Sequence, residues 1–130
     1  MRTPHTKTSY LINISVQARF VPDQSRPDEH EYVFAYTVRI QNDGAMAAQL
    51  ISRQWRIEDE TGNVVEVRGL GVVGKQPLLQ PGETFEYTSG SHLKTATGTM
   101  KGSYFFVAED GHRFDTEVPP FMLAAQRTLH

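Results

Sequence analysis

The sequence predicts an all-β domain, an antiparallel sandwich or barrel of about seven to nine strands. In several segments apolar and polar residues alternate with a period of two, which is the pattern of a half-buried strand. Turn signals rich in Gly, Asn, Asp and Pro separate these segments every ~8–15 residues. No window shows a convincing repeat of about 3.6 residues, so no long helix is expected.

The first two strands are expected from Tyr10 to Phe20 and from Glu31 to Gln41. In the first, the residues that share one face are Ile12, Ile14, Val16, Ala18 and Phe20. In the second, they are Tyr32, Phe34, Tyr36, Val38 and Ile40. Between the two strands, prolines mark Val21–Pro27 as a loop. Asn42-Asp43-Gly44 predicts a hairpin turn, because a primed turn needs positive φ and these residue types tolerate it.

Ala48–Glu58 is expected to be the third strand, with Ile51, Trp55 and Ile57 in phase. Arg53 falls among these apolar residues. A β-bulge, or an arginine stem lying along the edge of the core, would resolve the conflict. A lone tryptophan on the third strand resembles the immunoglobulin-type sandwich, here without its cysteines. Thr61-Gly62-Asn63 predicts the next turn, and Val64–Val67 a short strand.

The segment Gly69–Gly82 contains too much glycine and proline for regular structure to be expected there. Three further strands are predicted after it, over Thr84–Ser89, Thr99–Ala108 and Arg113–Leu123. Asp110-Gly111 is a hairpin signal between the last two. Pro119-Pro120 favours an edge strand or a strand end, because proline cannot donate to a ladder on that side.

Length and composition favour one soluble domain. The 130 residues suit a tail over 1–9 and a single domain over 10–130. The absence of cysteine excludes a disulfide framework, a thiolate zinc site and a cysteine nucleophile. A net charge of −2 gives little support to nucleic-acid binding. No apolar run approaches about 18 residues and no signal peptide is visible, so no membrane partner and a cytoplasmic location are expected.

The pattern Gly69-Leu70-Gly71-Val72-Val73-Gly74 is the first candidate site. In dinucleotide-binding folds this spacing joins a strand to a helix N-terminus that holds pyrophosphate. Here Pro77 and Pro81 follow instead of a helix, which argues against that fold. Two interpretations stay open. The glycines either allow close packing at a crossing between sheets, or form an anion-binding nest of backbone N–H groups. The nest would comprise Arg68, Gly69, Gly71, Gly74 and Lys75.

Asp28-Glu29-His30-Glu31 is the densest group of potential metal ligands. Carboxylates suit magnesium, and histidine adds affinity for cobalt or zinc. Adjacent residues of a strand point to opposite faces, however, so at most half of this group could converge. Solvated charge at a strand start is the alternative. No assembled catalytic constellation is visible, so no enzymatic activity and no cofactor are expected.

Several segments, taken together, resemble the bacterial ApaG family, also called CorD, in one register from about Tyr10 onward. They are Tyr32–Val38, Gln49–Trp55, Gly69–Pro77, Leu79–Glu83, Tyr87–Gly90, Gly98–Met100 with Gly102 and Tyr104, and Val118–Phe121 with Leu123. Ala96 departs from the family, which usually has proline there. The resemblance implies a fibronectin type III-like sandwich, in agreement with the strand pattern.

For function, the resemblance implies a link with magnesium and cobalt homeostasis and proximity to diadenosine-polyphosphate metabolism. It supplies no catalytic residues. Related domains in eukaryotic F-box proteins and in a DNA-polymerase-interacting protein point to protein binding. The family's suggested nucleotide or pyrophosphate contact falls on Gly69, Gly71 and Gly74. We therefore expect a non-enzymatic module that binds a protein partner. Anion or nucleotide-polyphosphate binding and direct metal binding are the alternatives, and exposed sheet edges make a homodimer an option.

Overall fold

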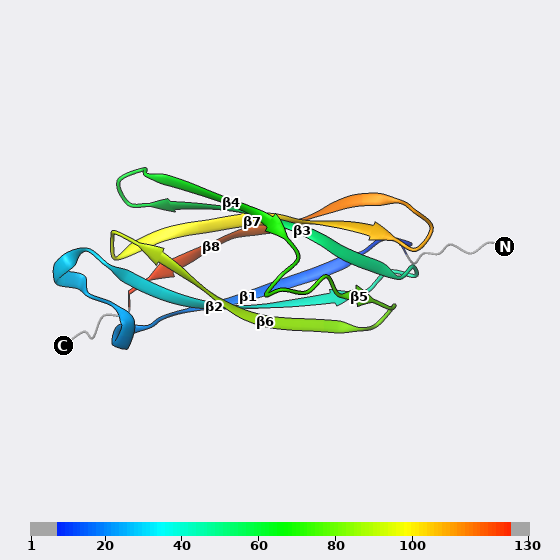
Figure 1. Cartoon of the computed structure of the whole chain (residues 1–130), viewed down its shortest axis with the longest axis horizontal. Coiled ribbons are helices and arrows are strands. Elements are labelled where there is room, and N and C mark those ends of the chain that lie inside the picture. Colours follow the sequence, from blue (N-terminus) through cyan, green and yellow to red (C-terminus); the bar gives the residue numbers. More distant parts are fainter. Residues whose placement is uncertain (1–7, 126–130) are drawn as a thin grey trace.

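The computed structural model describes residues 8–125 as two antiparallel β-sheets packed face to face, which confirms the predicted sandwich (Figure 1). The strands are β1 (Ile12–Phe20), β2 (Tyr32–Asn42), β3 (Ala48–Asp59), β4 (Val64–Leu70), β5 (Leu78–Leu79), β6 (Thr84–Leu93), β7 (Thr97–Ala108) and β8 (Arg113–Ala124). The loop after β1 contains two short 3-10 helices, η1 (Pro22–Gln24) and η2 (Pro27–Glu29). The predicted tail lies outside the described residues for positions 1–7.

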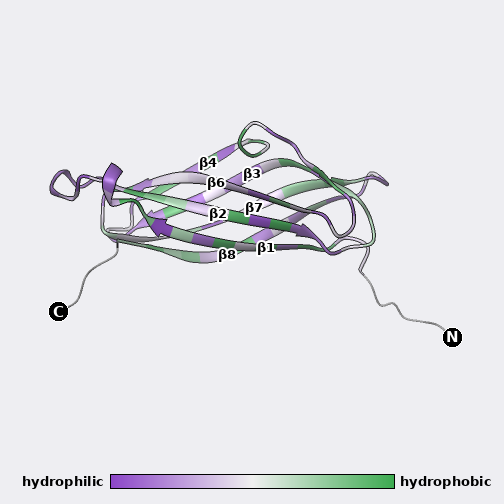
Figure 2. Cartoon of the chain, turned by 90° about the horizontal axis from the view of Figure 1, so that it is seen from below, coloured by the Kyte–Doolittle hydropathy of each residue, from purple (hydrophilic) through white to green (hydrophobic). Residues whose placement is uncertain are grey.

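The two sheets differ in width. The first has the order β1-β2-β6, and the second has the order β4-β3-β7-β8, with β5 paired to the same β3 strand. Strands β1 and β8 contact each other and close one side of the sandwich. Strands β4 and β6 border the opposite side, which we call the open side (Figure 2). None of the helices within residues 8–125 has the length and apolarity needed to cross a membrane.

The core forms from the apolar residues that alternate along the strands, and Figure 2 shows this alternation of hydropathy. The fully buried side chains include Phe34, Val38, Ile40, Leu50, Tyr104 and Phe106. Trp55 lies among three aromatic rings, at centroid distances of 5.5 Å from Tyr36, 5.9 Å from Tyr104 and 6.0 Å from Phe121. The faces predicted for the first two strands are the faces observed.

The prediction of a hairpin at Asn42-Asp43-Gly44 is wrong, because β2 and β3 belong to different sheets. Asn42 is buried, and its side chain acts as a hub. The amide nitrogen donates to the carbonyls of Met46 at 2.9 Å and Leu79 at 2.8 Å, and the amide oxygen accepts from the Gly44 N–H at 2.9 Å. The residue types that favour a primed turn serve another purpose here: the Asn42 side chain hydrogen-bonds backbone groups where the chain crosses from one sheet to the other.

The two features that could reconcile Arg53 with the apolar pattern of β3, a β-bulge and an arginine stem along the edge of the core, both occur. The register of β3 against β7 shifts between Leu50 and Ser52, so a bulge lies at Ile51. Beyond it, Arg53 shares the inner face with Trp55, at the edge of the core. Two turn predictions are also confirmed: Gly62 and Gly111 adopt φ values of 86° and 89° in the β3–β4 and β7–β8 hairpins.

Most strand ends lie within two residues of the prediction, and the larger differences surround the glycine segment. Strand β4 continues through Gly69 to Leu70, β5 forms inside the segment expected to be irregular, and β6 extends to Leu93. In each case a partner strand supplies backbone pairing that the local sequence does not reveal. The double proline lies in β8, which is an edge strand as predicted, and the β7–β8 register shifts opposite it, between Met100 and Gly102.

Candidate functional site

The glycine pattern ends in a tight two-stranded turn. The Val72 N–H donates to the Lys75 carbonyl at 2.8 Å, and the Lys75 N–H donates back to Val72 at the same distance, 2.8 Å. Between them Val73 and Gly74 both adopt positive φ, 42° and 79°, which is the geometry of a type I′ turn. This glycine hairpin, Val72–Lys75, places a valine in a conformation that β-branched residues rarely adopt.

Gly69 and Gly71 are glycines for steric reasons. A Cβ on Gly71 would lie 2.4 Å from the Lys75 carbonyl oxygen, and its φ is 64°. A Cβ on Gly69 would lie 2.9 Å from both terminal nitrogens of Arg53. The Gly71 N–H also donates to the Ile51 carbonyl at 2.8 Å. These contacts favour the packing interpretation of both glycines, since the Gly71 donor is occupied.

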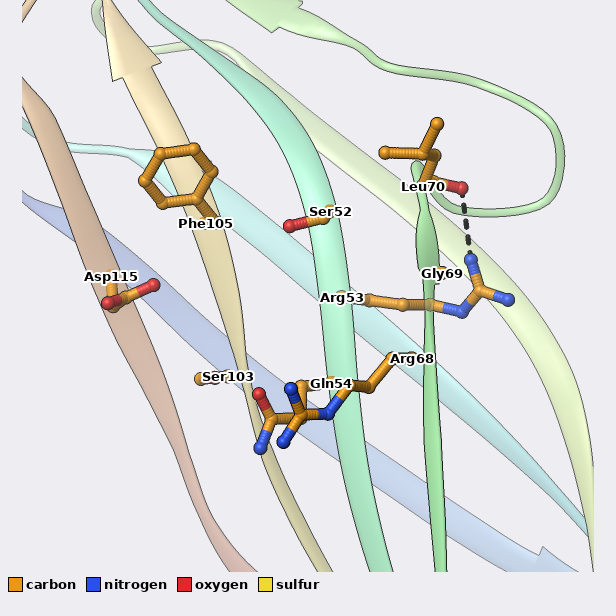
Figure 3. Close-up of a pocket in the computed structure, with 9 residues that line it drawn as sticks. All are labelled: Ser52, Arg53, Gln54, Arg68, Gly69, Leu70, Ser103, Phe105 and Asp115. Atoms are coloured by element: carbon orange, nitrogen blue, oxygen red, sulfur yellow. Dashed lines mark hydrogen bonds between the residues drawn. The ribbon is translucent and has the colours of Figure 1, made fainter.

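Arg53 holds this segment in place. Its Nη1 atom donates to the Leu70 carbonyl at 3.1 Å (Figure 3). The same atom donates to the Gly71 carbonyl at 2.8 Å. Within residues 8–125 no carboxylate pairs with this guanidinium. The sequence showed Arg53 only as a break in the apolar pattern of β3. Its contact with Gly69 depends on the β3–β4 register, in which the two residues are opposite each other.

A pocket of about 370 Å³ opens on the outer face of the second sheet beside Gly69. Arg68 extends across it over Gln54, and Ser52, Ser103, Phe105 and Asp115 complete most of its lining (Figure 3). The pocket thus offers a cation, a carboxylate, two hydroxyls and one aromatic ring. The structure brings Arg68 and Gly69 to this pocket, whereas Gly74 and Lys75 lie in the glycine hairpin and do not line it.

Apolar side chains border the same region. Leu70, Val73 and Leu78 are 74%, 54% and 53% exposed. They lie at the end of β4, at the tip of the glycine hairpin and in β5, and β4 and β5 pair with the same edge of β3. We call these three residues the hairpin patch. Sequence reasoning missed them, because only the course of the segment along β3 shows that they remain uncovered.

A second pocket, of about 580 Å³, lies at the end of the sandwich near η2. Ile57, Val65 and Leu93 provide apolar walls. Three of the predicted metal-ligand candidates, Glu29, His30 and Glu31, reach this pocket, together with Asp59 and His92, whereas Asp28 does not line it. Across residues 8–125, however, no three side chains of the metal-binding types gather closely enough to hold an ion.

One acidic side chain of this second pocket, Asp59, already accepts hydrogen bonds from the β3–β4 turn that follows it. The Asp59 carboxylate accepts from the Thr61 hydroxyl at 2.7 Å and from the Thr61 and Asn63 backbone N–H groups at 2.9 Å and 3.0 Å. These hydrogen bonds, that from the Thr61 hydroxyl above all, hold the pKa of Asp59 below its usual range. Asp59 therefore carries a negative charge at neutral pH.

A buried tyrosine pair lies behind Arg53. The hydroxyls of Tyr87 and Tyr104 are 2.6 Å apart. Burial raises the pKa of Tyr87 to about 12, and burial also raises the pKa of Tyr104 strongly. The charge of Arg53 opposes both rises only in part. Neither hydroxyl ionises near neutral pH, so the pair satisfies hydrogen bonds within the core.

Comparison with known proteins agrees with the resemblance noted in the sequence. A family profile described as the ApaG domain matches residues 22–108. The chain belongs to the ApaG family. Protein ApaG of Dechloromonas aromatica is 59% identical over 121 residues, covering 93% of this chain and 95% of the relative. Protein ApaG of Aromatoleum aromaticum is 60% identical over 121 residues, with the same coverage of 93% and 95%.

Two solved structures share the fold over nearly the whole chain. The crystal structure of a Bordetella pertussis protein named ApaA is 56% identical, with a TM-score of 0.91, and the match covers 94% of this chain and 99% of that one. A second X-ray structure, from the Northeast Structural Genomics Consortium, is 38% identical with a TM-score of 0.85, covering 97% and 94%. The ApaG fold therefore spans both pockets and the hairpin patch.

Proposed function

We propose that this ApaG domain is a non-enzymatic protein-interaction module that binds its partner through the hairpin patch. The observation that carries the proposal is the exposure of three large apolar side chains, Leu70, Val73 and Leu78, along one edge. Large apolar groups that stay exposed along one edge favour a protein-binding site there. The positive φ of Val73 supports the same interpretation, because strained backbone persists mainly where function requires it.

The outer-face pocket supplies the polar part of such an interface. Arg68 and Phe105 are of the residue types enriched at protein interfaces, and Ser52 and Ser103 add hydroxyls beside them. An acidic side chain on the partner would pair with Arg68 while an apolar side chain covers Leu70. In this proposal the family's link with magnesium and cobalt acts through the bound partner, in the cytoplasm, and not through a metal site on the domain.

Affinity capture with quantitative mass spectrometry tests the proposal. Burial of a leucine side chain is worth about 1.5–3 kcal/mol, so the Leu70→Ser variant should recover its partner about tenfold less or weaker still. Met122→Ser is the matched control, since Met122 is 60% exposed on β8 at another edge of the same sheet. The proposal fails if no captured protein distinguishes the two variants.

Anion binding is a second candidate, favoured by the tip of the glycine hairpin. The N–H groups of Val73 and Gly74 donate to no backbone acceptor within the described residues, and Lys75 adjoins them. Titration with pyrophosphate, followed by amide NMR shifts, tests this candidate. Shifts at Val73 and Gly74 that disappear in the Lys75→Gln variant would support it. Unchanged spectra at millimolar pyrophosphate would remove it.

A further inference from the structure

The unequal widths of the two sheets leave the inner face of β4 uncovered on the open side. Because β1 lies against β8 on the closed side, the three strands of the first sheet end before they reach β4. Val65 and Val67 point inward from β4, opposite Ile57 and Trp55 of β3. Even so, Val65 is 50% exposed, whereas Val38 and Ile40 in the covered part of the core are fully buried. One strand's width of apolar surface therefore lacks a covering layer.

The strand next to this gap is β6, the edge of the first sheet. It pairs with β2 without interruption, from Tyr32 opposite Leu93 to Gln41 opposite Thr84. It contains no proline, no lysine and no bulge, which are the usual devices that protect an edge strand. The edge strand β8, by contrast, carries two prolines and a register shift. The outer backbone edge of β6 is thus available for pairing along its length.

Two buried polar side-chain atoms lack partners within residues 8–125, and one of them lies on β6 beside the gap. The Ser91 Oγ and Trp55 Nε1 atoms are buried, and neither has a hydrogen-bond partner within residues 8–125. Ser91 belongs to the inner face of β6. The Trp55 indole lies over Gly102 of β7, among the rings of Tyr36, Tyr104 and Phe121. Buried polar atoms without partners are uncommon in folded proteins, and the Ser91 hydroxyl is one that a strand added beside β6 could hydrogen-bond.

The two ends of the gap carry opposite charge. At one end Arg53 has no carboxylate partner within residues 8–125, and Val72 fills the core beside it. At the other end the 580 Å³ pocket is lined by three carboxylates, those of Glu29, Glu31 and Asp59, against one ammonium group, that of Lys94. Asp59 lies six positions after Arg53 along β3, which is about 20 Å at the usual rise of a strand. An extended chain of about six or seven residues spans that length.

We propose that an extended segment of another protein adds to β6 as a fourth strand of the first sheet, beneath β4. Its backbone pairs with the free edge of β6, and alternate apolar side chains cover Val65 and Val67. A carboxylate at one end of the segment pairs with Arg53. A basic side chain at the other end meets Glu31 and Asp59. This strand-addition site is separate from the hairpin patch, so it goes beyond the function proposed above.

The probe is the capped heptapeptide Glu-Thr-Val-Thr-Val-Thr-Lys, in which Glu, both Val and Lys share one face. Titrated into the full chain to millimolar concentration, it should shift β6 amides, Ser89–Leu93 above all, and should slow hydrogen exchange on β6. The same peptide with N-methyl groups on the edge that pairs with β6 should bind at least tenfold more weakly, because it cannot form the ladder.

Charge pairing is tested by a double-mutant cycle. Arg53→Gln should weaken the Glu peptide several-fold but leave a Gln-substituted peptide nearly unchanged. Arg56→Gln, on the outer face of the same strand, is the matched control and should change neither affinity. Val65→Asp should abolish binding, and Leu70→Ser should not affect it. The result for Leu70→Ser distinguishes this site from the hairpin patch. If the proposal that the hairpin patch binds a protein partner fails, the heptapeptide result still stands.

Three results would overturn the proposal. One is an absence of β6 shifts at millimolar peptide. The second is equal binding of the N-methylated peptide, which would show that no backbone ladder forms. The third is self-association through β6, seen as a dimer in sedimentation with β6 amides already protected, because a second copy would then be the strand that fills the gap.

Discussion

Replacement of Gly102 by alanine should destabilise the domain severely, because this glycine lets β7 approach Trp55. A Cβ at position 102 would lie 2.2 Å from the Gln54 carbonyl oxygen and 2.7 Å from Cε3 of Trp55. Ordinary carbon–oxygen contacts are about 3.3 Å or longer, so β7 would have to move by about 1 Å. Strand β3 cannot yield, because β4 pairs with its other edge at the same positions. Overpacking of this kind costs about 3 kcal/mol.

Gly90→Ala is the matched control, a second glycine inside a strand. Its Cβ would meet only the Phe34 carbonyl oxygen, at an ordinary 3.5 Å. Since alanine has less conformational entropy to lose on folding, this variant should be about 0.5–1 kcal/mol more stable than the parent. Urea unfolding followed by the fluorescence of the single tryptophan measures both changes. Equal stability of the two variants would refute the argument from close approach.

Three further outcomes are expected. Asn42→Leu removes three buried hydrogen bonds and should cost about 4 kcal/mol in urea unfolding; a loss below about 1 kcal/mol would contradict its role as a hub. Gly71→Ala meets the Lys75 carbonyl at 2.4 Å with φ at 64°, so it should lower the melting temperature, whereas Gly74→Ala, with open space, should cost less. The pKa of Tyr87 is raised from 10.0 to about 12, so the native state holds this proton more tightly. That contribution is complete below pH ~10 and falls by about 1.4 kcal/mol per pH unit up to pH ~12; Tyr87→Phe should show a shallower alkaline loss in pH-dependent unfolding.

The strands could be predicted because the alternation of apolar and polar residues within each strand shows which of its faces is buried. In β1, apolar side chains alternate with Asn13, Ser15 and Gln17, and this pattern needs no knowledge of the partner strand. The turns at Gly62 and Gly111 were predictable for the same reason. Asn42-Asp43-Gly44 carries an equally strong local signal but connects two sheets. Local residue preference does not say whether the strands on either side of a turn pair with each other.

The candidate site was harder to predict than the fold. The sequence located the glycine segment but could not show that Arg53 approaches Gly69 and takes the Leu70 and Gly71 carbonyls. These contacts depend on the β3–β4 register and on the bulge at Ile51. Likewise, the alternation of residues around Val65 indicates that its side chain points inward, but it does not show whether the other sheet covers that side chain. That distinction requires the number of strands in each layer.

The closed side of the sandwich has a consequence for how this domain can be joined to others. Strands β1 and β8 lie side by side there and run in the same direction (Figure 1). The first strand therefore starts at one end of the sandwich, and the last strand ends at the opposite end. A polypeptide fused before β1 and another fused after β8 would leave in opposite directions. In such a fusion the domain would lie between its two neighbours along one line, and the edges of β4 and β6 would stay accessible from the side.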